Sequence, residues 1–390
     1  MHAFFWISLA IVFYTYLGYG LLLIVFNLLF KRRKVIDENY FPDVCFVVPA
    51  YNEEAIIGEK IENTLALIYP KEKISFLFIT DGSTDGTYSI VCKYPRIQLL
   101  HQSERRGKSA ALNRAMEKVT APIVVFSDAN TFLHPQSILK LVRHFRDSRV
   151  GGVSGEKRVA NPDSSAVGFG ERLYWQYESI LKKANADFYT IIGAAGELFS
   201  MRSNLYRPLD DKVILDDFVV SAGVCLQGYR FLYEREAFGT ETSSASMTEE
   251  RKRKIRISAG CFQAIFLLKG LLNPFGNFRV AFQYLSHRVL RWTLSPLLLP
   301  LLFVSNVFLC QQAGAGWIYN FFLGAQCLFY AAAIAGWLIV KRKMIPGLLL
   351  VPYYFLFMVL SQYAGFYRFV QGKHTPLWEK ADRQPITPTS

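Results

Sequence analysis

Three short polar clusters each follow a run of apolar residues in this chain of 390 residues. They are Pro49-Ala50-Tyr51-Asn52-Glu53-Glu54, Asp81-Gly82-Ser83-Thr84-Asp85-Gly86 and Ser127-Asp128-Ala129-Asn130. If the three clusters converge, their carboxylates, amides and hydroxyls form one acidic pocket for a polar ligand. Each cluster alone also fits a turn or a helix N-cap, because Asp, Ser, Thr and Gly are favoured there. The chemical interpretation therefore depends on convergence.

The segments around these clusters predict that they do converge. Short apolar runs predict buried strands, and the segments between them have apolar residues at helical spacing. This alternation is typical of a parallel sheet covered on both faces, in which ligands bind beyond the carboxyl ends of the strands. The predicted strands are Val44–Val48, Ser75–Thr80, Ile97–Leu100 and Pro122–Phe126, and the predicted helices include Glu53–Ile68 and Lys108–Val119.

Seven segments, in order along the chain, resemble the family-2 glycosyltransferases, whose membrane-bound members include the cellulose, hyaluronan and poly-N-acetylglucosamine synthases. The resemblance covers roughly Phe41 to Trp292. It implies an α/β glycosyltransferase A-type fold, a Rossmann-like mixed sheet that binds a nucleotide sugar, fused to transmembrane α-helices. The segments are VPAYNEE at Val48–Glu54, ITDGSTDGT at Ile79–Thr87, ERRGKSAALNRAM at Glu104–Met116, FSDANT at Phe126–Thr131, GAAGELFSMR at Gly193–Arg202, LDDFVVS at Leu215–Ser221 and RKRKIRISAG at Arg251–Gly260.

The resemblance implies that one group of residues surrounds the uridine of a UDP-sugar donor. In such a site an aromatic ring stacks on the base, and carboxylates accept hydrogen bonds from the ribose hydroxyls or the uracil imide. The matching residues here are Pro49, Tyr51, Glu53 and Asp81.

The resemblance also implies a diphosphate and metal site. Lys108 follows Gly107 at a predicted helix start, where an ammonium group and backbone amides can meet phosphate. A solvated lysine at a helix end is the alternative. Asp128 and Asn130 match the family's Asp-x-Asp motif, whose oxygen ligands hold Mg²⁺ or Mn²⁺. Because Asn130 replaces the second acid, this site carries one negative charge fewer.

An inverting transferase needs a carboxylate that removes the proton from the attacking acceptor hydroxyl. The resemblance assigns Asp217 as this base and Asp216 as its support, since neighbouring carboxylates raise one pKa. Two acids at a helix N-terminus are the structural alternative. Gly193 and Gly196 would allow an acceptor sugar to approach the backbone, although they also fit a packing turn. Glu197 is grouped with this acceptor segment, without a defined role.

The run from Arg251 to Arg256 has five basic residues in six positions. Such a run is usually a solvated cationic face or an interfacial anchor. The family carries Gln-x-x-Arg-Trp in this region, a motif associated with processive chain extension, so the resemblance assigns Arg253 and Arg256 to the diphosphate. Ile257 stands where the tryptophan is expected. Processive synthesis and transfer of a single sugar both stay open.

Apolar segments at both ends predict a membrane protein. Residues 3–30 contain no charged residue, and this length suffices for a helix across about 30 Å of hydrocarbon. A cleaved signal peptide is the alternative, but the basic cluster Lys31–Lys34 follows the segment instead of preceding it. Further spans are predicted near 294–312, 318–340 and 345–367. The basic flanks, which include Lys341–Lys343, place the catalytic domain in the cytoplasm of a multi-pass inner-membrane protein.

The C-terminal tail is not assigned to a side of the membrane. A third C-terminal span would carry it outside, whereas its basic residues favour the inside, and a re-entrant segment is the alternative. These residues are Arg368, Lys373, Lys380 and Arg383.

Composition narrows the remaining possibilities. The net charge of +13 is explained by basic residues next to anionic membrane lipid, so nucleic acid is not required. The 6 cysteines and 6 histidines show no metal-ligand spacing, which predicts free thiols in a reducing compartment and argues against catalytic zinc.

The predicted organisation is an N-terminal transmembrane helix (1–30), a cytoplasmic glycosyltransferase domain (41–250), a basic segment with an interfacial helix (251–290), three C-terminal spans (294–367) and a tail (368–390). The predicted function is transfer of a sugar from a UDP-sugar to a polysaccharide or lipid-linked glycan at the cytoplasmic membrane face. One alternative is a nucleotide-binding regulatory membrane protein without catalysis. A transporter is disfavoured, because the spans lack the charges expected along a substrate path. Partner subunits are not predicted.

Overall fold

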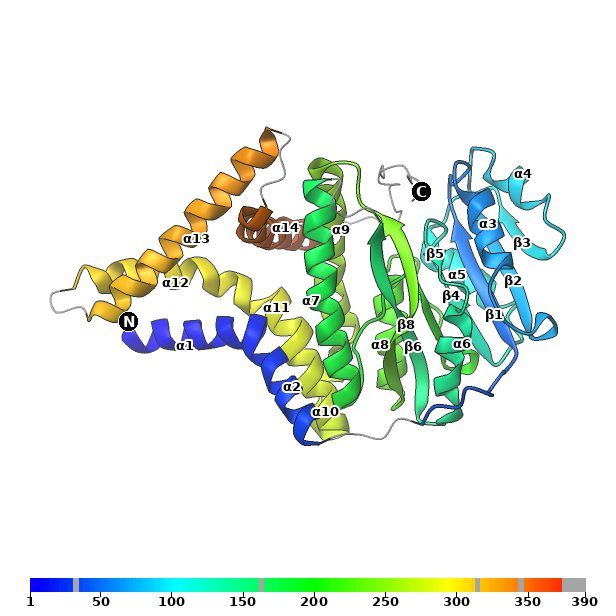
Figure 1. The fold of residues 1–390 in the computed structure, drawn as a ribbon, viewed down its shortest axis with the longest axis horizontal. Coiled ribbons are helices and arrows are strands. Elements are labelled where there is room, and N and C mark those ends of the chain that lie inside the picture. Colours follow the sequence, from blue (N-terminus) through cyan, green and yellow to red (C-terminus); the bar gives the residue numbers. More distant parts are fainter. Residues whose placement is uncertain (31–34, 161–164, 313–315, 343–346, 374–390) are drawn as a thin grey trace.

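The computed structural model describes residues 1–30, 35–160, 165–312, 316–342 and 347–373. Figure 1 shows a sheet domain on one side and long apolar helices on the other, with helices α7 (Ala166–Phe188) and α9 (Met247–Leu267) standing between them. The basic cluster Lys31–Lys34, Lys343, and the tail residues Lys380 and Arg383 lie outside the described residues.

An eight-stranded mixed sheet forms the centre of the sheet domain, with the strand order β3-β2-β1-β4-β7-β6-β8-β5. Strands β1 to β4 are parallel to one another, whereas β7 is antiparallel to both β4 and β6. The strands are β1 (Val44–Ala50), β2 (Ile74–Asp81), β3 (Ile97–Gln102), β4 (Ile123–Phe126), β5 (Phe132–Leu133), β6 (Val150–Ala160), β7 (Phe199–Arg202) and β8 (Arg230–Thr242).

The predicted fold class is confirmed, and all four predicted strands are present. Parallel pairing, predicted from the alternation of strands and helices, holds for β1 to β4. Beyond β4 the sheet becomes mixed, because β7 enters in the opposite direction. The first polar cluster begins within β1 and continues past its end, and the second and third clusters follow β2 and β4.

Alternation of side chains along β1 explains why both faces of the sheet are covered. Phe46 and Val48 belong to one buried cluster with Ile57 and Ile61, and Val47 belongs to the cluster on the other face. The helices that cover the strands are α3 (Ile57–Leu65), α4 (Thr87–Val91), α5 (Lys108–Met116), α6 (Ser137–Val142) and α8 (Asp216–Leu226).

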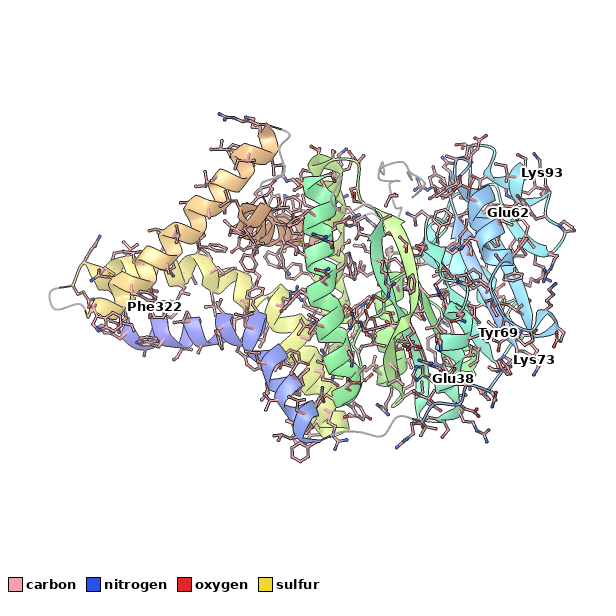
Figure 2. All side chains as sticks on the ribbon, in the orientation of Figure 1. Glu38, Glu62, Tyr69, Lys73, Lys93 and Phe322 are labelled. Atoms are coloured by element: carbon pink, nitrogen blue, oxygen red, sulfur yellow. The ribbon has the colours of Figure 1, made fainter. Side chains whose placement is uncertain are left out.

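The chain enters the sheet domain through a segment tied down at two points. Tyr69 Oη donates a hydrogen bond of 2.5 Å to the carbonyl oxygen of Pro42, and Lys73 Nζ donates one of 2.9 Å to that of Phe41. Figure 2 shows both side chains at the edge of the sheet domain, far from Phe322 in the apolar helices. The entry to β1 is therefore fixed.

Three helices of the described residues are long and apolar enough to cross a membrane: His2–Leu29, Trp317–Lys341 and Gly347–Val370. A pair bent by 52°, Pro274–Trp292 and Leu294–Cys310, adds a fourth if it is one broken span. Helices therefore lie at each predicted span, while the crossing itself stays a prediction. They are α1 (His2–Phe13), α2 (Tyr19–Leu29), α10 (Pro274–Tyr284), α11 (Leu290–Trp292), α12 (Leu294–Cys310), α13 (Trp317–Lys341) and α14 (Leu350–Val370).

Helix α9 contains both the basic run and the start of the predicted interfacial helix Cys261–Leu272. It ends at Leu267, and its residues Cys261, Phe262 and Ala264 are buried. This part of α9 is therefore a core helix over much of its surface, and contact with lipid stays a prediction.

Candidate active site

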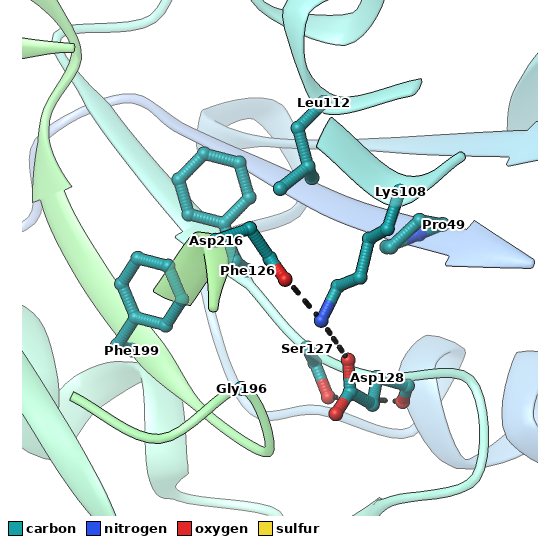
Figure 3. Close-up of a pocket in the computed structure, with 9 residues that line it drawn as sticks. All are labelled: Pro49, Lys108, Leu112, Phe126, Ser127, Asp128, Gly196, Phe199 and Asp216. Atoms are coloured by element: carbon teal, nitrogen blue, oxygen red, sulfur yellow. Dashed lines mark hydrogen bonds and ion pairs between the residues drawn. The ribbon is translucent and has the colours of Figure 1, made fainter. Parts of the chain in front are cut away.

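Lys108 lies between two carboxylates that come from different elements. Its Nζ is 2.7 Å from Asp128 Oδ1, just after β4, and 3.2 Å from Asp216 Oδ2, at the start of α8. Figure 3 shows both contacts, with the chain at Gly196 passing alongside and Pro49 lining the same pocket. The structure thus brings segments far apart in the sequence to one place at the carboxyl edge of β1 and β4.

The charges in this group shift one another's protonation. Burial acts against the charge of Lys108, but the attraction of Asp128, Asp216 and Asp217 outweighs burial and raises its pKa. Burial raises the pKa of Asp217 to about 7, repulsion by Asp216 adds to this rise, and the attraction of Lys108 opposes it. A carboxyl group with a pKa near 7 is well suited to act as a general base at neutral pH.

Two glycines allow the backbone to approach these side chains. A Cβ at Gly196 would lie 2.9 Å from Asp128 Oδ2 and 3.1 Å from Lys108 Nζ, so a side chain there would crowd the ion pair. Gly193 has a φ of +90°, and a Cβ there would lie 2.1 Å from the Phe218 ring. The segment predicted to face the acceptor therefore passes close to the acidic pair, and only glycine fits at its tightest points.

Asp81, predicted to contact the uridine, holds the loop that presents Lys108. Its Oδ2 accepts hydrogen bonds from the backbone N–H groups of Arg106 and Gly107, at 3.0 and 2.6 Å. Its Oδ1 pairs with Arg114 at 2.9 Å. Asp81 is only 2% exposed. This carboxylate thus fixes the start of α5, and its role toward uridine stays a prediction.

Tyr51 and Glu53, which are predicted to contact the uridine, follow the end of β1. The guanidinium carbon of Arg105 is 3.8 Å from the centroid of the Tyr51 ring. Glu53 is buried, and its backbone N–H donates a hydrogen bond of 2.8 Å to Thr87 Oγ1 at the start of α4. The backbone N–H of Glu54 donates a hydrogen bond of 3.1 Å to Asp85 Oδ2, so the first and second polar clusters are in direct contact.

The pocket lined by Pro49, Lys108, Asp128, Gly196 and Asp216 is partly open, and its empty space of about 180 Å³ includes solvent at its mouth. Pockets that bury small ligands usually measure about 300–1,000 Å³. A nucleotide sugar therefore requires side chains at this edge to move. Lys108 projects into the pocket (Figure 3), which makes it a side chain that a bound diphosphate would reposition.

The residues at Asp128 fit a divalent cation that substrate phosphates help to hold. Asp128 and Asp216 both direct an oxygen at one positive atom, Lys108 Nζ, and hard oxygen ligands suit Mg²⁺ or Mn²⁺. Within the described part of the chain, no three His, Cys, Asp or Glu side chains gather as a complete ligand set. Mg²⁺ is commonly held by one or two carboxylates together with phosphates, so an incomplete protein set is what such a site requires.

Arg253 and Arg256, the two residues of α9 predicted to bind the diphosphate, lie in different environments. Arg253 pairs with Glu171 and, at 2.9 Å, with Glu250. Burial has the largest effect on Arg256 and lowers its pKa. The charges of Asp216 and Asp217 are close enough to oppose this effect. The structure therefore brings Arg256 toward the acidic pair, whereas Arg253 is engaged by acids of α7 and α9.

Three residues that were not predicted from the sequence form a connected group next to Phe218, close to the acidic pair Asp216 and Asp217. Trp292 contacts Phe218, with ring centroids 5.2 Å apart, and Phe218 directly follows Asp217. Arg288 lies over the same Phe218 ring at 5.8 Å. Glu178 binds both Arg288, at 2.7 Å, and Arg291, at 3.0 Å.

A sequence signal for these residues was present. The run Arg288-Val289-Leu290-Arg291-Trp292 contains an Arg-Trp pair at the spacing sought in Arg253–Arg256. The tryptophan that seemed to be replaced at Ile257 therefore has a counterpart further along the chain. Its place beside Phe218 puts an aromatic ring next to the residue that follows Asp217.

Comparison with known proteins gives a consistent result for the middle of the chain. Residues 45–209 match the sequence model of the family described as Glycosyl transferase family 2. A poly-beta-1,6-N-acetyl-D-glucosamine synthase of Staphylococcus aureus is 26% identical over 215 residues, which cover 52% of this chain and 51% of that protein. The beta-monoglucosyldiacylglycerol synthase of Synechocystis is 30% identical over 138 residues, covering 34% and 28%. The match thus spans about half the length of the first relative and less of the second.

A solved structure resembles nearly the whole chain. It is a mannosyltransferase from Pyrobaculum calidifontis in complex with GDP-Man and Mn²⁺. The alignment covers 95% of this chain and 99% of the other, with a TM-score of 0.72 and 23% identity. The two chains therefore share a fold that includes the apolar helices.

Proposed function

Because residues 45–209 form a family 2 glycosyl transferase domain, we propose that this protein is an inverting transferase. It moves a sugar from a UDP-sugar to a hydroxyl group of a polysaccharide or lipid-linked glycan. The observation that supports this most is the contact of Lys108 with both Asp128 and Asp216. It unites the segments expected to hold the diphosphate, the metal and the acceptor.

On the donor side, Lys108 offers its ammonium group to the diphosphate, and the N-terminus of α5 adds favourable backbone amides. Tyr51 and Glu53 hold the nucleoside together with Pro49. Asp128, with the amide oxygen of Asn130, would hold a divalent cation, which when bound neutralises charge on the leaving diphosphate. Arg256 adds positive charge near the same acids.

On the acceptor side, Asp217 removes the proton of the attacking hydroxyl. The hydroxyl oxygen forms a bond to the anomeric carbon while the bond from that carbon to the diphosphate breaks, and the electron pair leaves with the nucleoside diphosphate. Asp216 keeps the pKa of Asp217 high through charge repulsion. The reaction therefore needs one base and one well-held leaving group.

The apolar helices support a site at the membrane surface, since α7 lies between the sheet domain and helices α2 and α10 (Figure 1). With the basic flanks as guide, the domain faces the cytoplasm of a multi-pass inner-membrane protein. Relatives include both a polymer synthase and a glycolipid synthase. Chain extension and addition of one sugar to a lipid are therefore two versions of this proposal, and Trp292 supports the first by supplying an aromatic wall.

A screen of UDP-sugars, with GDP-mannose included because of the structurally similar mannosyltransferase, tests the proposal. Nucleotide release is measured in Mg²⁺ and in Mn²⁺, and radiolabelled products are sized. We expect one UDP-sugar to be consumed, and Asp217→Asn to retain UDP binding while transfer falls by about 1,000-fold or more. Binding of UDP with no turnover of any donor would instead identify a nucleotide-binding regulator. Full transfer by Asp217→Asn would remove Asp217 from the mechanism.

A further inference from the structure

Trp175 and Lys182 present their side chains on the same face of α7. They are seven residues apart, which is close to two helical turns. Lys182 Nζ lies 5.5 Å from the Trp175 ring centroid and 5.7 Å from that of Tyr233 on β8. Lys157 Nζ, from β6, lies 5.0 Å from the same Trp175 ring. This face of α7 therefore points at the sheet and not at the apolar helices.

Glu197 meets these residues from the loop before β7. Its Oε1 accepts a hydrogen bond of 2.5 Å from Lys157 Nζ, the same ammonium group that lies near Trp175. We call Trp175, Lys182 and Glu197 the α7 cluster.

Two members of the α7 cluster have a buried polar atom without a hydrogen-bond partner. Trp175 Nε1 and Glu197 Oε2 make no hydrogen bond to any described residue. Lys182 is 4% exposed, and its ammonium group lies over the rings of Trp175 and Tyr233. Buried polar atoms without partners are rare and unfavourable, so two of them beside this ammonium group indicate a site that a ligand completes.

The polar groups of the α7 cluster are complementary in type. Trp175 Nε1 and Lys182 Nζ can only donate hydrogen bonds, and the carboxylate oxygen of Glu197 can only accept them. A sugar hydroxyl does both, so neighbouring hydroxyls on one ring can satisfy all three groups.

The α7 cluster adjoins the proposed base. Lys182 interacts electrostatically with both Glu197 and Asp217, and Asp217 interacts with Glu197. Asp217 also interacts with Lys108 and Asp128, which serve the donor in the proposed function. The cluster therefore lies within electrostatic reach of the proposed base.

Acids and bases alternate around the cluster. Lys157 faces two acids, Glu197 and Glu241, and Glu178 faces two bases, Arg288 and Arg291. The charges of Arg253 and Glu171 also act on Lys157, so groups of both signs surround the cluster. Such mixed surroundings suit a neutral sugar, whose hydroxyls can donate to acids and accept from bases.

We propose that Trp175, Lys182 and Glu197 bind the hydroxyl groups of a neutral acceptor sugar and orient its attacking hydroxyl toward Asp217. This inference rests on the proposed function and deepens it. Asp217 remains the base, and the three residues set which acceptor is used and in which orientation.

Acceptor kinetics of the full-length protein test this inference. The donor is the nucleotide sugar found in the release screen, and the acceptor probes are octyl β-D-glucopyranoside and octyl N-acetyl-β-D-glucosaminide. Donor hydrolysis without either probe is measured alongside, because it reports the donor half of the site and correct folding. The variants are Glu197→Gln, Lys182→Met and Trp175→Phe. Glu241→Gln is the matched control, since Glu241 binds the same Lys157 but its Oε1 and Oε2 both have partners.

We expect Glu197→Gln and Lys182→Met to raise the KM for the better probe by about 10-fold or more, since each loses a hydrogen bond to a charged group. Trp175→Phe keeps the ring and loses one neutral donor, so a rise of about 2- to 10-fold is expected. Donor KM should stay within about 2-fold in all three variants, hydrolysis should fall less than transfer, and Glu241→Gln should leave the acceptor KM within about 2-fold.

Unchanged acceptor KM in the three variants would overturn the assignment of the α7 cluster while leaving the proposed function standing. An equal loss of hydrolysis and transfer would also overturn it, because the residues would then support the fold or the donor. Hydrolysis by the wild type without transfer to either probe would overturn the neutral sugar as ligand. A wild type that consumes no nucleotide sugar would contradict the proposed function itself.

Discussion

Lys108 Nζ lies 2.7 Å from Asp128 Oδ1, so the residue assigned to the donor diphosphate and the residue assigned to the metal are in direct contact. In the proposed function the ammonium group would contact the diphosphate, and Asp128 would contact the cation. Donor binding then exchanges one set of charge contacts for another. This exchange makes Lys108 the first residue to test.

Lys108→Met should raise the KM for the donor by about 10-fold or more, because a charge-assisted contact to phosphate is lost. Steady-state kinetics and UDP binding by calorimetry measure the effect. Lys118→Met, at an exposed position just beyond α5, removes an equal charge elsewhere and should leave the donor KM near that of the wild type. A wild-type donor KM in Lys108→Met would exclude the diphosphate role.

The pH dependence of transfer should report Asp217. Its pKa is raised to about 7, so below pH 7 it is protonated and cannot accept the proton of the acceptor. The value of kcat/KM should therefore rise with pH and level off above about 7. Asp216→Asn removes a charge that raises this pKa, so the rise should shift to lower pH. An identical profile in Asp216→Asn would show that another group controls the rise.

Asn130→Asp restores a second acid to the segment that begins at Asp128. The added negative charge should strengthen attraction for a divalent cation, so the Mn²⁺ concentration for half-maximal transfer should fall by about 3-fold or more. Titration of EDTA-treated protein measures this value. Asn130→Ala removes the amide oxygen and should move the value the other way. If both variants match the wild type, Asn130 does not contact the metal.

Lys60 gives a prediction for stability. It is 0% exposed, and its Nζ donates hydrogen bonds of 2.8 Å to Ser127 Oγ and 2.5 Å to the carbonyl oxygen of Thr131. Burial lowers its pKa to about 7, compared with about 10.4 in an unfolded chain. Between these values the unfolded state binds the extra proton, so this residue makes stability rise with pH, by at most about 1.4 kcal/mol per pH unit.

Lys60→Met abolishes that contribution. Melting of the detergent-solubilised protein from pH 7 to 9.5 should show the Tm difference growing in favour of the wild type as pH rises. Lys93→Met, at an exposed position, should show a constant difference. A constant difference in Lys60→Met as well would mean that Lys60 keeps its proton in the fold.

Gly193→Ala should impair both folding and catalysis. Ala at a φ of +90° costs about 1–2 kcal/mol of backbone strain, and its Cβ displaces Phe218 beside Asp217. A fall in kcat of about 10-fold or more is expected from misplacement of the base. Gly228→Ala is the control, with a φ of +86° but no atom within 4 Å of the new Cβ. It should lose stability and keep kcat, whereas equal kcat in the two variants would exclude the steric effect.

Local patterns predicted the strands and the positions of the polar clusters, because a buried strand and the turn after it depend mainly on residues that are neighbours in the sequence. The same patterns did not give Asp81 its observed contacts. Its bond to Gly107 depends on how β2 and α5 meet, which spans 26 positions in the chain. The antiparallel direction of β7 could not be predicted from these patterns either, since an apolar run is the same for a parallel and an antiparallel strand.

Long-range ion pairs were the least predictable part of the site. Glu178 and Arg291 are 113 positions apart, so neighbouring residues give no signal of their contact. Trp292 could have been found, since its Arg-Trp pair is plain in the sequence. The basic run at Arg251–Arg256 has the charge expected of the motif, but Ile257 stands in the place of the tryptophan.

Tyr19 Oη donates a hydrogen bond of 2.6 Å to Asn185 Oδ1, and Gln283 Nε2 donates one of 2.8 Å to the same oxygen. The side-chain amide of Asn185 on α7 thus accepts hydrogen bonds from α2, which precedes the sheet domain in the sequence, and from α10, which follows it. Deleting the apolar N-terminal helices to obtain a soluble fragment would remove the hydrogen bond from Tyr19 to Asn185. Helix α7, which contains Trp175 and Lys182, would then be held less firmly. Enzymology on this molecule belongs in micelles or nanodiscs, with both ends left intact.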